Sequence, residues 1–112
     1  MTENSDFNTF ELLIVKDQII SALKTCYDPE IPVNIYELGL IYSVDVDTTG
    51  GVQIKMTLTS PACPAAQSLP PEVKQKAEGV KGVTSANVEV VWEPRWDPSM
   101  MSEEAKLALN MY

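Results

Sequence analysis

The strongest constraint on the fold is a pair of alternating segments joined by a glycine turn. Apolar residues occupy every second position of 40–46 and again of 52–58, with Thr-Thr-Gly-Gly at 48–51 between them. Such alternation is typical of strands with one buried face, and the turn between them predicts an antiparallel hairpin. The apolar face of this hairpin must be covered by other elements of the chain.

Helical spacing predicts the elements that cover it. Asn8 stands three residues before Glu11, a capping-box spacing, and apolar residues at helical intervals predict a helix from about 9 to 25. Residues 64–81 have a helical pattern interrupted by Pro70-Pro71, which predicts a short first piece and a second helix from about 71.

Two further elements follow toward the end of the chain. Alternation over 87–92 predicts a third strand, and Ser102 is a good N-cap for a last short helix. The order helix, strand, strand, helix, strand, helix predicts an α+β fold, a two-layer α/β sandwich with helices on one face of a three-stranded sheet. We expect one domain over 1–112, with 1–7 as a flexible arm.

The charge and the terminal sequence narrow the classes of partner. The net charge is −8, with sixteen acidic residues against eight basic ones, which argues against binding nucleic acid or an anionic membrane. The first residues are polar and acidic where a secretory signal would be basic, and no apolar run is long enough to span a bilayer. We therefore expect a cytoplasmic protein whose acidic surface suits basic protein partners.

One cysteine lies in a position that favours chemistry. In LTSPACPAA, residues 58–66, Cys63 stands between Pro61 and Pro64 and just before a predicted helix start. Unpaired backbone N–H groups at a helix start stabilise a thiolate, which is both a nucleophile and a soft metal ligand. The alternative is a small buried residue at the end of a strand.

The number of possible ligands limits what this thiol can hold. The chain has two cysteines and no histidine. An iron–sulfur cluster usually takes four thiolates, so a monomer cannot enclose a cluster with cysteines alone. A cluster or iron would be held transiently, shared across a homodimer, or contacted on a partner. We expect the second cysteine, Cys26, to pack in the core.

Polar residues near these cysteines are the remaining site candidates. Asp28 and Glu30 follow the first helix, and the alternative to a functional role is a helix stop with solvated carboxylates. Thr59 and Ser60 precede Cys63 and could donate hydrogen bonds to a thiolate or ligand, or could be ordinary polar residues at a strand end.

The tail, residues 91–112, has two tryptophans, two prolines and two adjacent methionines before its helix. Such a group either closes the core of a small domain or forms a surface for partners. Trp92 continues the alternation of the third strand, so we expect it in the core; Trp96 is a weaker candidate for burial.

Three stretches together resemble the SufT/PaaD-type family of metal–sulfur cluster assembly proteins: YDPEIPVNIYELGLIY at 27–42, MTLTSPACPAA at 56–66, and the tail from Trp92. The resemblance implies an accessory or carrier factor, not an enzyme, that works with the iron–sulfur assembly machinery and client apo-proteins. It places the cysteine of the family at Cys63 as a metal or cluster ligand. It also places the acidic motif at Asp28 and Glu30 and the Thr-Ser pair at Thr59 and Ser60.

Two other functions remain open from the sequence. A thiol-dependent enzyme would need a base near Cys63, which without histidine would be Asp28, Glu30 or a lysine. A partner-binding adaptor would act through the tryptophan-rich tail, and one branch of the resembling family supports an oxygenase system of phenylacetate degradation. Arg95 alters the family's proline-rich stretch in that tail.

Overall fold

The computed structural model describes residues 8–27, 33–59 and 65–109, so the predicted arm 1–7 lies outside it. The elements are α1 (Thr9–Leu23), β1 (Ile41–Val46), β2 (Gly51–Met56), α2 (Ala65–Glu78), β3 (Ser85–Val90), the 3-10 turn η1 (Pro98–Met100) and α3 (Glu103–Ala108). This order confirms the predicted α+β fold. Within the described residues, no helix has the length and apolar character needed to cross a bilayer.

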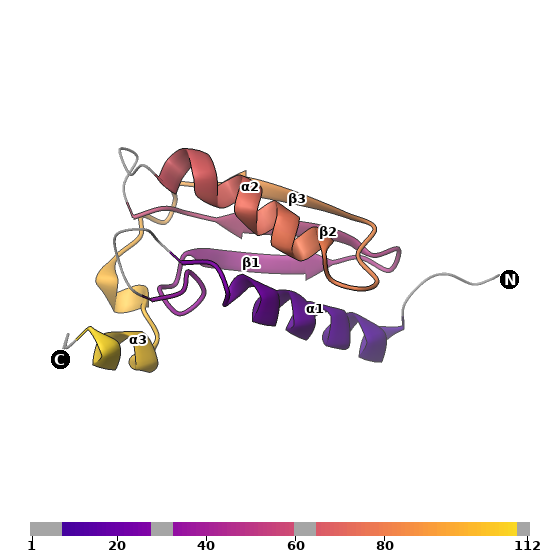
Figure 1. Cartoon of the computed structure of the whole chain (residues 1–112), viewed down its shortest axis with the longest axis horizontal. Coiled ribbons are helices and arrows are strands. Elements are labelled where there is room, and N and C mark those ends of the chain that lie inside the picture. The colour runs from indigo at the N-terminus through magenta and orange to yellow at the C-terminus, as the bar shows by residue number, and fades with distance from the viewer. Residues whose placement is uncertain (1–7, 28–32, 60–64, 110–112) are drawn as a thin grey trace, which may run out of the picture.

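The sheet has the strand order β1-β2-β3 (Figure 1). The β1–β2 hairpin is antiparallel as predicted, and β2 runs parallel to β3 with α2 as the connection. Gly50 adopts a φ of +91° in the hairpin turn, a conformation that residues with a side chain rarely adopt.

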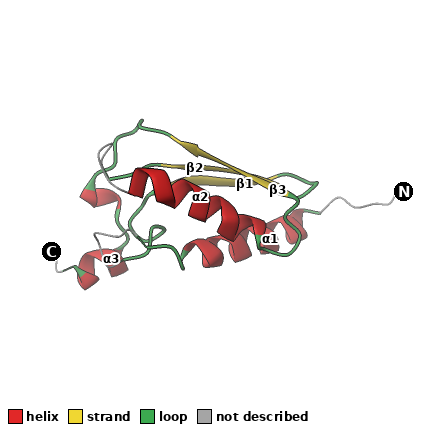
Figure 2. Cartoon of the chain, turned by 45° about the horizontal axis from the view of Figure 1, so that its top comes forward, coloured by secondary structure: helices red, strands yellow, loops and turns green. Residues whose placement is uncertain are grey.

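The molecule has two layers, with α1 and α2 packed against one face of the sheet (Figure 2). Ile54 and Met56 of β2 are fully buried there, against helix residues that include Ile19 and Val73. The opposite face is polar, and α3 lies at one end of the sheet (Figure 1).

The start of α1 follows the predicted capping box. The Asn8 side chain accepts a hydrogen bond from Glu11 N at 2.8 Å, and the Glu11 carboxylate accepts one from Asn8 N at 3.0 Å. The helix ends at Leu23, two residues earlier than predicted, and its apolar stripe of Val15, Ile19 and Leu23 is buried.

The predicted break at Pro70-Pro71 is wrong, because α2 runs without interruption from Ala65 to Glu78. Proline has a helical φ, and two adjacent prolines remove only two neighbouring backbone hydrogen bonds. Leu69 lies just before the pair and Val73 just after it, and both are buried. Burial of the apolar stripe on both sides of the prolines therefore favours one continuous helix.

The expectation for the two tryptophans is also wrong. Strand β3 spans Ser85–Val90 and ends before Trp92, which is 42% exposed. Trp96 is the one that packs against the core, and its indole N–H donates to Leu38 O at 2.8 Å. Alternation could not reveal this, because the contact of Trp96 joins residues far apart in the chain.

Candidate functional site

The described residues that flank the predicted motifs lie at the end of the sheet where β2 ends. The end of α1, the start of α2 and α3 lie at this same end (Figure 1). The end of β2 is hydrogen-bonded to the chain on both sides. Thr57 N donates to Leu40 O, just before β1, and Val91 N, just after β3, donates to Met56 O, each at 2.8 Å.

Most of the predicted site residues lie outside the described parts of the chain. These are Asp28, Glu30, Ser60 and Cys63. Thr59 is described, and it is half-buried at the exit of β2, after the buried Thr57 and Leu58. The structure therefore places the residues that flank the two motifs but not the motifs themselves.

The acidic segment 28–32 is flanked by residues that pair with each other. Tyr27 and Asn34 form an antiparallel bridge, and Ile35 N donates to Cys26 O at 2.9 Å. The Asn34 side chain also accepts from Glu37 N at 2.9 Å, which fixes the turn that follows. The residues on either side of the acidic motif are therefore held together at the end of α1.

Cys26 packs in the core, as the sequence predicts, and its side chain is fully buried. Burial raises the pKa of its thiol to about 11, and the Glu72 carboxylate on α2 adds to this while Lys76 opposes it. Metal binding and nucleophilic attack both need the thiolate. Cys26 is therefore a poor ligand, and the described residues contain no group of three or more His, Cys, Asp or Glu that could hold a metal ion.

Tyr42 of β1 is a feature of this end of the sheet that sequence reasoning missed. Its hydroxyl donates to Pro94 O at 2.7 Å and lies 3.6 Å from the Met100 sulfur. Burial raises the pKa of Tyr42, and the nearby Thr57 hydroxyl partly opposes the rise. Tyr42 joins the start of β1 to the tail, and only its place in an apolar alternation was visible in the sequence.

A small cavity of about 190 Å³ opens between the residues that flank the acidic segment and α3. Tyr27 and Val33 line it from the flanks of that segment, and Ala105 and Ala108 line it from α3. Its other lining residues are Asn34, Glu37 and Glu104. It is smaller than the roughly 300–1,000 Å³ of small-molecule pockets, so its size fits one side chain of a partner better than a cofactor.

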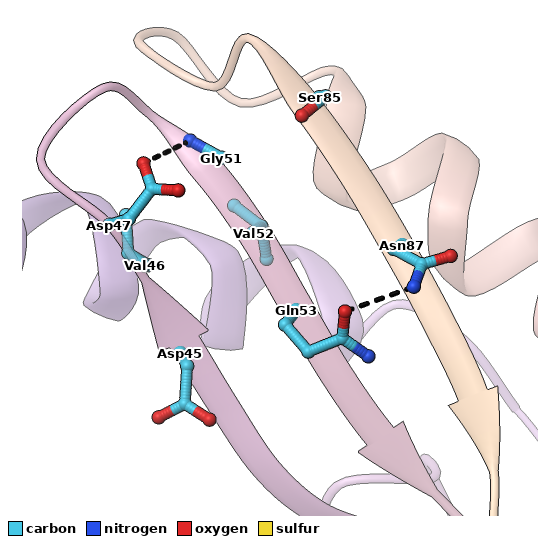
Figure 3. A pocket seen from close by; sticks show the side chains of 8 residues that line it. All are labelled: Asp45, Val46, Asp47, Gly51, Val52, Gln53, Ser85 and Asn87. Atoms are coloured by element: carbon cyan, nitrogen blue, oxygen red, sulfur yellow. Dashed lines mark hydrogen bonds between the residues drawn. The ribbon is translucent and has the colours of Figure 1, made fainter.

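A larger hollow, of about 330 Å³, lies at the other end of the sheet (Figure 3). Three of its polar side chains are already hydrogen-bonded: Asp47 accepts from Gly51 N, and Asn87 donates to Gln53 Oε1, both at 2.9 Å. The carboxylates of Asp45 and Asp47 point in different directions (Figure 3). The hollow is therefore a solvated part of the polar sheet face rather than a cation site.

Comparison with known proteins agrees with the resemblance in the sequence. The model of the family described as iron–sulfur cluster assembly protein matches residues 16–90. An Fe-S protein maturation auxiliary factor of Porphyromonas gingivalis is 52% identical over 100 residues, which cover 89% of this chain and 95% of that protein. The auxiliary factor YitW of Bacillus subtilis is 42% identical over 97 residues, which cover 87% and 95%.

A solved structure gives the same answer for the fold. A domain of unknown function from Bacillus anthracis superposes with a TM-score of 0.86 at 35% identity, covering 94% of this chain and 100% of that one. The matched family segment contains both predicted motifs and all three strands. The chain belongs to the iron–sulfur cluster assembly protein family.

Proposed function

We propose that this protein is an accessory or carrier factor in the assembly of iron–sulfur clusters and the maturation of iron–sulfur proteins. The observation that carries the proposal is the family match over residues 16–90, which includes both motifs. Relatives at 52% and 42% identity are named Fe-S protein maturation auxiliary factors. A carrier role needs an accessible ligand and a partner, not a turnover site.

In this proposal Cys63 is the thiolate that contacts iron, a cluster or the thiol of a partner. Asp28 and Glu30 supply an oxygen ligand or the rim of the site, and Thr59 and Ser60 donate hydrogen bonds to the bound sulfur. The burial of Cys26 leaves Cys63 as the one candidate thiol of the chain. Since a cluster usually takes four thiolates, the cargo is held transiently and completed by a second molecule.

The partners in this proposal are the assembly machinery and client apo-proteins, and a homodimer is one way to supply a second thiol. The cytoplasm fits the proposal, because a reducing compartment keeps Cys63 a thiol. Nucleic acid and membranes are not expected partners, since the net charge is −8.

The two cysteines provide a matched test. Cys63→Ala should lower the activity of iron–sulfur enzymes in cells, whereas Cys26→Ala should leave it unchanged at equal protein level. Cys26→Ala removes the same group from the core, so it separates loss of a thiol from loss of Cys63. Equal activity for Cys63→Ala and wild type, with unchanged partner binding, would sink the proposed role.

Reconstitution of the cluster tests whether one thiol per chain is enough to hold it. Under anaerobic conditions with iron and sulfide, native mass spectrometry should find no stable cluster on the monomer and a cluster only when an apo-client is added. A stable cluster on the monomer would contradict transient holding by one thiol.

Asp28→Asn and Glu30→Gln should each slow the transfer of the cluster to the client if these carboxylates act as proposed.

An adaptor function through the tail is supported by one observation. Trp92 is 42% exposed and Leu107 of α3 is 64% exposed, so the tail presents apolar side chains to solvent. If the tail is the partner surface, Trp92→Ala should abolish client binding while Cys63→Ala should not. Pull-down of the same client with both variants decides between the two functions.

A further inference from the structure

The outer edge of β3 is an unpaired strand edge within the described structure. The parallel register with β2 runs without a shift from Ser85 to Val90, and Val91 N donates to Met56 O. Backbone groups of alternate residues point to opposite sides of a strand. The N–H and C=O groups of Ala86, Val88 and Val90 therefore point away from β2.

The two edge strands of the sheet differ in how well they are protected from pairing with another strand. The register of β1 with β2 shifts between Ile41 and Ser43, and Lys16 and Ile20 of α1 line a cavity together with β1 residues. A bulge and a covering helix are common devices against edge pairing. Strand β3 has no bulge, proline or lysine, and it forms the edge of the sheet remote from α1 (Figure 1).

An apolar rim follows this open edge on the helix side. Val80, Val83, Val88 and Val90 are half-buried and pack against the core. An added strand would complete their burial, and each further Å² of apolar surface removed from water is favourable. The edge therefore offers both backbone groups and apolar side chains to another strand.

The sequence of β3 is complementary to itself in one antiparallel register. With Val88 opposite Val88 of a second copy, Ala86 lies opposite Val90 and Asn87 lies opposite Glu89. Apolar residues then meet on the helix side, and each Glu89 carboxylate meets an amide instead of another carboxylate. The three outward-facing residues of each strand form about six hydrogen bonds in this register.

We propose that two copies of this chain associate through their β3 edges, antiparallel and centred on Val88, to form one continuous six-stranded sheet. The contact involves one short strand per copy, so the dimer is a weak one. The carboxyl ends of the two β2 strands lie at opposite ends of this dimer. The contact therefore does not join these two ends of β2, and the proposal does not rest on cluster binding.

Asn87 provides a test with two opposite outcomes. Asn87→Lys places a cation opposite Glu89 of the second copy. It should lower the dissociation constant of the dimer by about 2- to 30-fold, because two cross-strand charge pairs form. Asn87→Glu places two carboxylates opposite each other and should raise this dissociation constant by a similar factor. Both variants lose the bond to Gln53, so this loss cancels in their comparison.

Analytical ultracentrifugation over micromolar to millimolar protein concentrations measures the dissociation constant of the dimer for each variant. Gln18→Lys and Gln18→Glu change the net charge equally on the exposed face of α1, and should shift dimerisation less than the Asn87 pair does. Added salt should tighten the wild-type dimer, because each copy carries a charge of −8. A monomer at every concentration for wild type and Asn87→Lys, or equal shifts for the Asn87 and Gln18 pairs, overturns the proposal.

Discussion

At the scale of single residues, burial decides which of the two thiols is available for chemistry. Cys26 is fully enclosed at the end of α1, where burial and the Glu72 carboxylate raise the pKa of its thiol to about 11. The sequence placed Cys26 two residues from the acidic motif, so proximity in the chain alone would have made it a candidate ligand. Its surroundings in the fold make it a packing residue.

Cys26 should react with a thiol reagent only when the protein unfolds. In the Cys63→Ala variant, labelling of Cys26 by a maleimide in native buffer should be at least about 10³-fold slower than in guanidinium, since exchange needs opening of the core. Mass spectrometry over time gives both rates. Similar rates with and without denaturant would contradict the burial of Cys26.

Gly39 should tolerate no side chain. Its φ is +83°, and a Cβ placed there would overlap the carbonyl oxygen of Met100. Gly39→Ala should therefore lower the free energy of unfolding by about 2–4 kcal/mol, measured in urea. Gly79→Ala is the control, because its Cβ would lie 3.6 Å from the nearest atoms, and it should change that free energy by about 1 kcal/mol or less. Equal effects of the two variants would exclude a close contact at Gly39.

At the scale of elements, the hairpin is held by its turn as well as by its ladder. The Asp47 carboxylate accepts from Thr49 N at 2.9 Å, from Thr49 Oγ1 at 2.6 Å and from Gly51 N at 2.9 Å. These hydrogen bonds hold the pKa of Asp47 below its ordinary 3.8, with the Thr49 hydroxyl as the largest cause. The charged form of Asp47 therefore favours the folded hairpin.

Acid should weaken this contribution of Asp47 to folding. Because the folded pKa is lowered, the contribution is present above the ordinary pKa of 3.8 and is lost as the pH falls through the lowered folded value. Asp47→Asn has no proton to gain, so its stability should fall less than that of wild type between neutral pH and about pH 2. Thermal unfolding followed by circular dichroism compares the two, and parallel pH profiles would argue against this role.

Local pattern predicted the elements whose causes are local. The alternation of β1 and β2, the capping box of Asn8 and Glu11, and the N-cap at Ser102 all appear in the structure. The continuity of α2 through Pro70-Pro71 depends instead on burial of Leu69 and Val73 against other elements. No local signal carries that information, so the predicted break was wrong.

At the scale of the whole molecule, the tail closes the fold even though the matched family segment ends at residue 90. Ser102 N donates to Glu37 O at 2.8 Å, and Met101 and Ala105 are buried. Together with the bonds of Trp96 and Tyr42, these contacts attach the tail to β1 and to the turn that precedes it. The tail therefore supports the region that carries the predicted site.

The two tryptophans should differ in their effect on stability. Trp96→Phe removes the donor to Leu38 O and should lower the free energy of unfolding by about 1–2 kcal/mol. Trp92→Phe keeps most of an exposed side chain, and the change should stay within about 0.5 kcal/mol. Denaturant unfolding of the two variants measures the difference, and a larger loss for Trp92→Phe would favour the sequence-based prediction instead.

The site could be predicted from the sequence only as a set of motifs. The family resemblance named Cys63, Asp28 and Glu30, and the fold brings the flanks of both segments to one end of the sheet. The role of Tyr42 at that end depends on a contact with Pro94, 52 residues away, which no pattern within the strand could show. The roles of the motif residues remain predictions that the variants above test.

Helix α1 begins at the end of the sheet opposite to α3 (Figure 1). This arrangement affects how partners should be captured. An affinity tag or fluorescent protein joined ahead of α1 is remote from Tyr27, whereas one joined after α3 stands on the side of Tyr27, which lines a cavity together with Ala105 and Ala108 of α3. Fusions of the first kind leave this cavity accessible, and those of the second kind serve as a steric block.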